Sequence, residues 1–177
     1  YPHVLLHTFA YKHTVPAPQH VVARDNVIVR LCSFTCNYHK PFEVLAKEDP
    51  DSDDAVFVNA LQDWKAHATQ IYIWDYATNF HNYLQPFFNF HNMAENIRYF
   101  KREGVRGVME QGNFAYGGGA AMDDLKSYIS GRLLWNPETD VDNEMQRYFK
   151  AVYGEKAAPY MAQYVDLMET ATEKDCL

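Results

Sequence analysis

Two carboxylates follow short apolar runs of the sequence, and they are the residues best suited to catalysis. Asp75 follows the run Gln-Ile-Tyr-Ile-Trp, and Glu110 follows Val-Arg-Gly-Val-Met just before a glycine-rich stretch. Glycosidases use two carboxyl groups, one to protonate the leaving oxygen and one to attack the anomeric carbon or activate water. The sequence therefore predicts Glu110 as an acid, base or nucleophile, with Asp75 as the second catalytic candidate.

Both carboxylates also have a structural explanation. Glu110 could be tied to a neighbouring Arg or Lys, and Asp75 could cap the loop or helix that follows it. These alternatives stay open at the level of the sequence.

Aromatic and polar side chains cluster around the ends of the same runs. Tyr and Trp rings stack on sugar rings and also offer a polar atom for hydrogen bonding, although the same side chains serve equally well in cores. We expect substrate contacts from residues that end the apolar runs or lie in the following loops, namely Tyr11, Lys12, Trp74, Tyr76, Asn79, Gln111, Asn113 and Tyr116.

Cysteine and histidine suggest a different chemistry. Cys32, Cys36 and His39 lie within eight residues, but a closed zinc site needs four ligands and usually has more tightly spaced pairs. Buried thiols are the better prediction for both cysteines, and we expect no metal and no cofactor. Three cysteines in all do not form a disulfide framework.

Composition narrows the class of protein. The 177 residues are 47% hydrophobic and 22% charged, which suits one domain with a substantial core. The net charge of −7 disfavours a nucleic-acid partner, because binding to phosphates needs basic residues. No apolar run approaches the roughly 20 residues that span a bilayer, so we expect no membrane span.

The elements that position these residues form an α/β pattern. Four apolar runs of strand length, rich in β-branched and aromatic residues, cover 4–10, 27–32, 70–74 and 105–109, as is typical of buried parallel strands. Apolar residues recur at helical spacing over 56–64, 93–100 and 122–133. They do so again around 145–152 and 161–168, with Gly154 between these two segments. Strands that alternate with helices predict βα units.

Four βα units are half of an eight-stranded barrel. We therefore expect the C-terminal half of a (β/α)8 barrel over residues 1–135, with additional helices over 136–177 packing on it. A small doubly wound sheet is the alternative, because spacing alone does not separate the two folds.

Six segments form a series with a definite order and spacing, namely Phe9-Ala10-Tyr11, Asn26–Cys32, Ile73–Tyr76, Gly107–Gly112, Leu125–Tyr128 and Leu133–Pro137. Together they resemble glycoside hydrolase family 163, a family of secreted bacterial proteins that was first defined as a domain of unknown function. The resemblance covers the chain from its start to about residue 153.

The resemblance implies an endo-β-N-acetylglucosaminidase that acts on N-glycans, and a secreted, periplasmic or cell-surface location. It places the chain over the last four strands of the barrel. A second catalytic carboxylate could then lie upstream of Tyr1, and we expect the chain to associate with a missing N-terminal half or with itself. Neither Asp75 nor Glu110 has an acidic neighbour in sequence, which favours a carboxylate nucleophile over substrate assistance.

Two other functions remain open. The chain could be a glycan-binding protein that has the aromatic residues but no working acid pair. It could also be a metal-binding or redox protein built on Cys32, Cys36 and His39.

Overall fold

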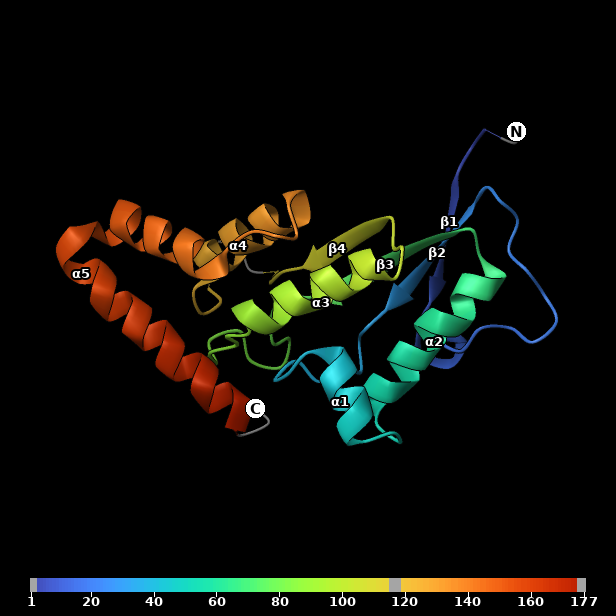
Figure 1. Ribbon diagram of the computed structural model, residues 1–177, viewed down its shortest axis with the longest axis horizontal. Helices are drawn as coiled ribbons and strands as arrows, with labels where there is room; N and C mark the ends of the chain where they lie inside the picture. Colours follow the sequence, from blue (N-terminus) through green and yellow to red (C-terminus); the bar gives the residue numbers. More distant parts are fainter. Residues whose placement is uncertain (1–2, 115–118, 175–177) are drawn as a thin grey trace. The chain divides into compact units, whose positions relative to one another are not determined.

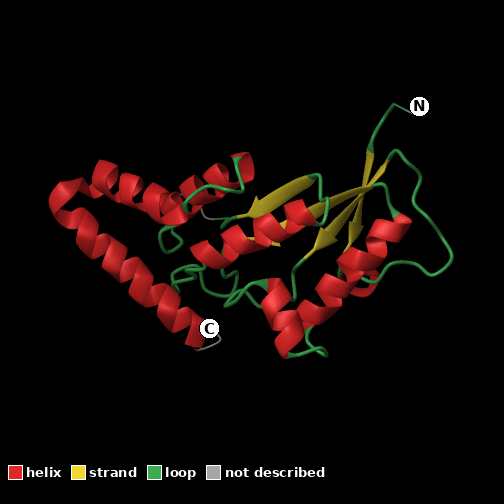
Figure 2. Ribbon diagram, in the orientation of Figure 1, coloured by secondary structure: helices red, strands yellow, loops and turns green. Residues whose placement is uncertain are grey.

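The computed structural model describes residues 3–114 and 119–174, and it contains a parallel sheet with helices (Figures 1 and 2). The strands are β1 (Leu6–Ala10), β2 (Val27–Cys32), β3 (Gln70–Tyr76) and β4 (Gly107–Gln111). The helices are α1 (Phe42–Glu48), α2 (Asp53–His67), α3 (Phe90–Arg102), α4 (Asp123–Trp135) and α5 (Val141–Lys174), with a short 3-10 helix, η1, at Lys12–Thr14.

The sheet has the order β1-β2-β3-β4, and each neighbouring pair is parallel. This confirms the predicted α/β class and the predicted adjacency of the four strands. Crossovers between parallel strands are almost always right-handed, so a sheet whose spatial order follows the chain order carries its connecting helices on one face.

The register gives the two faces of the sheet different chemistry. On the face toward the helices lie Leu31, Ile73 and Val108, which are paired across β2, β3 and β4. On the other face, Arg30 pairs with Tyr72 and Cys32 pairs with Trp74. Burial alternates along β3, where Ile71, Ile73 and Asp75 are buried and the residues between them are part-exposed.

Local sequence signals explain where α2 begins. The Ser52 hydroxyl accepts a hydrogen bond from the Ala55 amide at the start of α2, and Asp53 and Asp54 occupy the first turn. Both features stabilise a helix N-terminus. The core beside the sheet is aromatic, since the rings of Phe42, Phe57 and Phe100 contact one another with centroids 5.3–6.2 Å apart.

The chain forms two compact units. The sheet unit comprises Tyr1–Asn37, Pro41–Tyr76 and Arg98–Gln111, and the helical unit comprises Tyr38–Lys40, Ala77–Ile97 and Gly112–Leu177. The boundary therefore passes through α3, between Ile97 and Arg98. The division expected from the sequence, a half-barrel over residues 1–135 and additional helices over 136–177, remains a prediction.

The helical unit is held by an apolar cluster, and a cation is buried beside it. Phe88, Ile97, Ile129 and Phe149 are among its fully shielded members. Lys126 of α4 is also buried, and its Nζ donates to the Phe87 carbonyl at 2.7 Å. At Gly154 of α5, φ is 80°, so the helix is interrupted at the residue where the sequence predicts a break.

Within the part of the chain that the structure describes, no helix combines the length and the hydropathy needed to cross a membrane.

Candidate active site

Aromatic residues line the face of the sheet opposite to the helix-facing apolar rows, and we call this surface the aromatic face. Trp74 and Tyr76 of β3 and Gln111 of β4 lie near its carboxyl edge, where parallel strands end together. The Trp74 indole donates to the Gln111 Oε1 at 2.6 Å, which fixes the ring across the two strands. Its members in the strands include His7, Phe9, Arg30, Tyr72, Trp74, Tyr76 and Gln111.

The carboxyl edge of this face continues into a row of rings. The Phe34 ring lies between Tyr11, with centroids 5.4 Å apart, and Tyr76, with centroids 5.6 Å apart. The Lys12 ammonium stands over the Tyr11 and Phe34 rings, 5.3 and 5.8 Å from their centroids. Edge-on ring contacts of this kind leave ring faces available for a further apolar surface.

The aromatic face carries one guanidinium, that of Arg30. Its Cζ lies 5.8 Å from the centroid of Phe9 and 5.6 Å from that of Trp74. Its Nη2 lies 3.0 Å from Nδ1 of His7, and because arginine only donates, His7 must be the acceptor in this bond.

A glycine makes room for the aromatic layer. A Cβ on Gly107 of β4 would lie only 2.6–2.9 Å from ring atoms of Tyr72 on β3. The absence of a side chain at this position therefore lets the Tyr72 ring lie close to the backbone of β4.

Asp75 and Glu110 lie on the other face of the sheet. They are directly paired across β3 and β4, and neighbouring strands are about 4.8 Å apart. Asp75 is 2% exposed and accepts a hydrogen bond from the Ser33 hydroxyl at 2.5 Å, whereas Glu110 is part-exposed. The carboxylates thus adjoin each other but alternate with the aromatic residues.

The structure brings some of the predicted site residues together and separates others. Tyr11, Lys12, Trp74, Tyr76 and Gln111 share the aromatic face or its edge. The paired carboxylates form a separate group on the helix-facing side.

Two of the remaining predicted contacts belong to the other compact unit, and one lies outside the described residues. Asn79 and Asn113 are in the helical unit, where the Asn79 side chain bonds to Gln85 and to the His81 amide. Tyr116 lies outside the described residues.

Sequence reasoning missed several members of the aromatic face, above all Arg30, Phe9 and Tyr72. One signal was present, since Arg30 is the only charged residue in the apolar run Val-Ile-Val-Arg-Leu-Cys. A charge inside a strand that is otherwise apolar marks a position facing away from the core.

The cysteines are in a poor environment for thiolate chemistry. Burial raises the pKa of Cys32 to about 11, and burial together with the nearby Asp54 and Asp75 raises the pKa of Cys36 well above its ordinary value. A thiol binds metal as the thiolate. Among residues 3–114 and 119–174, no group of three or more His, Cys, Asp or Glu side chains is arranged to hold a metal ion.

Tyr76, at the edge of the aromatic face, keeps its phenolic proton. Burial, reinforced by nearby Cys32, Tyr11 and Asp75, raises its pKa above the ordinary value for tyrosine. Like an ordinary tyrosine, it is protonated at physiological pH, and a protonated phenol is able to donate a hydrogen bond.

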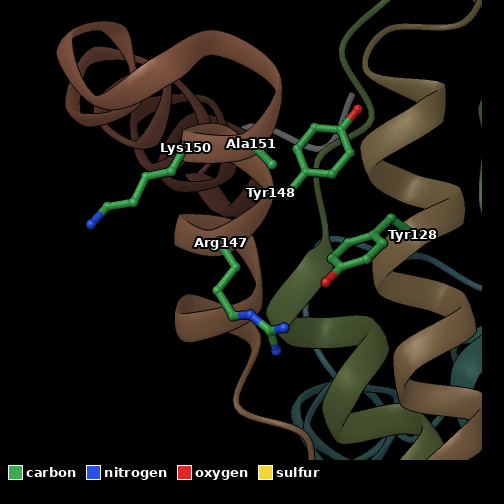
Figure 3. Close-up of a pocket in the computed structure, with 5 residues that line it drawn as sticks. All are labelled: Tyr128, Arg147, Tyr148, Lys150 and Ala151. Atoms are coloured by element: carbon green, nitrogen blue, oxygen red, sulfur yellow. The ribbon is translucent and has the colours of Figure 1, made fainter.

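A hollow of about 550 Å³ lies in the helical unit, lined by Tyr128 of α4 and by Arg147, Tyr148, Lys150 and Ala151 of α5 (Figure 3). The two tyrosine rings lie next to each other, 5.4 Å between centroids, and the Lys150 side chain extends away from them (Figure 3).

Two polar groups of this hollow, those of Tyr128 and Arg147, are engaged with a buried carboxylate. Glu144 accepts from the Tyr128 hydroxyl at 2.5 Å, from Arg147 at 2.9 Å and from Arg132 at 3.2 Å. The Tyr128 hydrogen bond, followed by the two guanidinium charges, lowers the pKa of Glu144. This network joins α4 to α5. That structural role is enough to explain the polar residues at this hollow.

Comparison with known proteins gives one match. A family model described as a domain of unknown function, DUF4838, matches residues 1–166. Neither the curated proteins nor the solved structures contain a match to the chain.

Proposed function

The chain belongs to the DUF4838 family of domains of unknown function, and from that premise we propose that it is part of a glycoside hydrolase. In this proposal the four-stranded sheet is half of a (β/α)8 barrel, and the aromatic face lines the barrel interior. The substrate is a glycan that contains N-acetylglucosamine, and the enzyme is an endo-β-N-acetylglucosaminidase that works in a secreted, periplasmic or cell-surface setting.

The observation that carries the proposal is the aromatic face itself. Trp74, Tyr76 and Gln111 combine flat apolar rings with hydrogen-bonding groups at the carboxyl edge of a parallel sheet. Barrel enzymes hold their substrates at that edge. Sugars present an apolar ring face and a rim of hydroxyl groups, and this combination of side chains matches both.

Glu110 is the catalytic residue in this proposal. Its residue is part-exposed although its Oε1 is buried, and it lies one residue before the end of β4, at the edge where barrel enzymes hold their substrates. Asp75 is almost fully buried and bonded to Ser33, so we assign it a positioning role on its paired neighbour. The second carboxylate of the mechanism then comes from another part of the barrel.

One observation favours a second function, glycan binding without hydrolysis. Asp75 and Glu110 occupy the face opposite to Trp74. A sugar stacked on Trp74 would therefore meet no carboxylate from β3 or β4 unless it reached around the edge of the sheet.

Hydrolysis of an N-glycan and thermal unfolding, measured together, separate the alternatives. In the intact protein, Glu110→Gln should lower turnover by at least about 100-fold, because it removes proton transfer while nearly preserving volume. Its melting temperature should stay near that of the natural protein. Glu155→Gln, at a glutamate whose side chain is 79% exposed, is the matched control and should change neither quantity.

Each other outcome has a clear meaning. Near-normal turnover in Glu110→Gln would end its catalytic assignment. A clear loss of melting temperature in that variant would identify a structural carboxylate. Binding of the glycan by the natural protein without any hydrolysis would favour the second function.

A further inference from the structure

Arg30 is the one described cation of the aromatic face that lies within a strand. It is the fourth of the six residues of β2, and its guanidinium lies beside the rings of Phe9 of β1 and Trp74 of β3, which contact each other with centroids 5.2 Å apart. Phe9 is 51% exposed, and Arg30 and Trp74 are part-exposed. The guanidinium is therefore held in place by aromatic rings and remains close to solvent.

The bonding of this guanidinium is incomplete in the part of the chain that the structure describes. His7 accepts from its Nη2, while its Nε is buried and has no hydrogen-bond partner there. Buried polar atoms nearly always have a partner, so a donor left in this state points to an acceptor that is supplied from outside.

No counter-charge is available on the same surface. The strand residues that the register places on the aromatic face, from His7 on β1 to Gln111 on β4, include no described Asp or Glu. The carboxylates of β3 and β4 are on the opposite face. The chain as a whole carries a net charge of −7. The lack of a described carboxylate beside Arg30 is therefore a property of this surface and does not follow from the overall composition.

We propose that Arg30 binds the carboxylate of an acidic sugar whose ring packs against Trp74 and Phe9. The planar guanidinium matches a carboxylate in geometry and charge, and charge-assisted hydrogen bonds of this type are the strong ones. The aromatic rings supply an apolar contact for the sugar ring. A small carboxylate ion without a sugar ring would make no use of this contact. The inference rests on the proposed glycan function and adds to it the substrate class, a glycan that includes a uronic or other carboxylated sugar.

The test compares two sugars that differ at one group. Methyl β-D-glucuronide carries a carboxylate where methyl β-D-glucoside carries a hydroxymethyl group. Calorimetric titration of the natural chain should show binding of the glucuronide about 10-fold tighter than that of the glucoside, as expected for one hydrogen-bonded charge pair.

Substitutions assign this preference to Arg30. In Arg30→Gln the two sugars should bind within about 2-fold of each other, while Arg30→Lys should keep part of the preference because it keeps the charge. Arg106→Gln, at an exposed arginine just before β4, should leave the preference unchanged. The measurement on the natural chain stands whether or not the variants fold.

Three results would overturn the inference. Equal affinity of the natural chain for both sugars would remove the acidic specificity and leave the proposed glycan function in place. No binding of either sugar, with N-acetylglucosamine also failing to bind, would count against both. Displacement of the glucuronide by an equal concentration of inorganic sulfate, at constant ionic strength, would show a simple anion site in which the sugar ring plays no part.

Discussion

At the scale of single residues, the packing of the aromatic face depends on its rings and also on the size of the side chains paired with them across adjacent strands. Tyr72 lies over Gly107, and the next aromatic residue of β3, Trp74, bonds to Gln111. The Arg30 guanidinium lies beside the contacting rings of Phe9 and Trp74. The glycine of β4 is therefore matched with a large ring on the adjacent strand.

Gly107→Ala should destabilise the protein by about 1–3 kcal/mol, the usual cost of adding volume to a packed site. The new Cβ would lie 2.6 Å from the Tyr72 ring, so the ring or the strand must move. Chemical denaturation measures the change in the free energy of unfolding. Gly112→Ala is the control, because a Cβ there meets nothing within 4 Å.

A double variant tests the cause of that loss. In a Tyr72→Ala background, which removes the ring, Gly107→Ala should cost much less. An equal cost in both backgrounds would show that contact with Tyr72 is not the reason for glycine at this position.

At the scale of elements, the strands were predictable in place and direction but not in length. The apolar runs predict β3 to end at Trp74 and β4 at Met109, whereas the strands continue to Tyr76 and Gln111. This difference matters because successive side chains of a strand point to opposite faces. Asp75 and Glu110, expected to follow the strands, lie within them and so face away from Trp74.

Helices were predictable where the sequence carries a start or stop signal. Ser52 with its acidic neighbours marks the start of α2, and Gly154 marks the interruption of α5. The short helix α1 was missed, because its N-cap is Pro41, which offers no side-chain acceptor. Its place is fixed instead by the burial of Phe42 and Leu45, which only the tertiary structure shows.

His91 joins α3 to both ends of α5 in the helical unit. Its Nδ1 lies 2.7 Å from Glu169, its Nε2 lies 3.2 Å from Asp142, and its backbone amide donates to Glu169 at 3.1 Å. Asp166 and these three residues line a second hollow of the helical unit, of about 280 Å³. The Glu169 hydrogen bond, opposed by burial and assisted by the charges of Glu169 and Asp142, raises the pKa of His91 to about 9.

The stability of the protein should therefore depend on pH through His91. A histidine whose pKa rises from 6.5 to about 9 on folding contributes fully below pH 6.5. Its contribution disappears as the pH rises to 9, because the folded protein then loses the proton as well. The difference in unfolding free energy between the natural chain and His91→Gln should be largest near pH 6 and should shrink toward pH 9.5.

Denaturant unfolding at a series of pH values measures this difference. His67→Gln, at a part-exposed histidine of α2 in the sheet unit, controls for the loss of a histidine as such. A difference that is constant from pH 6 to pH 9.5 would show that His91 acts through packing and not through its charge.

At the scale of the whole molecule, the sequence predicts which segments form the sheet but not which side chains meet across it. Arg30 and Phe9 are 21 positions apart, and their contact follows from the register of β1 on β2. Periodicity within one segment carries no information about register. The chemistry of the aromatic face therefore became visible only once the four strands were paired.

The edge strand β1 differs from the strands beside it in how little of it is covered. Leu6 and Phe9 lie on opposite faces of β1 by register, and they are 56% and 51% exposed. The preceding Leu5 is 52% exposed. By contrast, Val29 and Leu31 of β2 are buried. Exposed edge strands with apolar side chains pair readily with further strands.

We expect the chain to associate with a second copy through β1. Sedimentation velocity over a range of concentrations should show an apparent mass that rises above that of one chain. Leu6→Lys should weaken this association by about 10-fold or more, because a charged side chain on an edge opposes pairing. Leu167→Lys, which places the same charge at an exposed position of α5, should leave it unchanged. A single-chain mass for the natural protein even at millimolar concentration would show that β1 is stable as a free edge. Equal weakening by both lysine variants would trace the association to net charge and not to the strand.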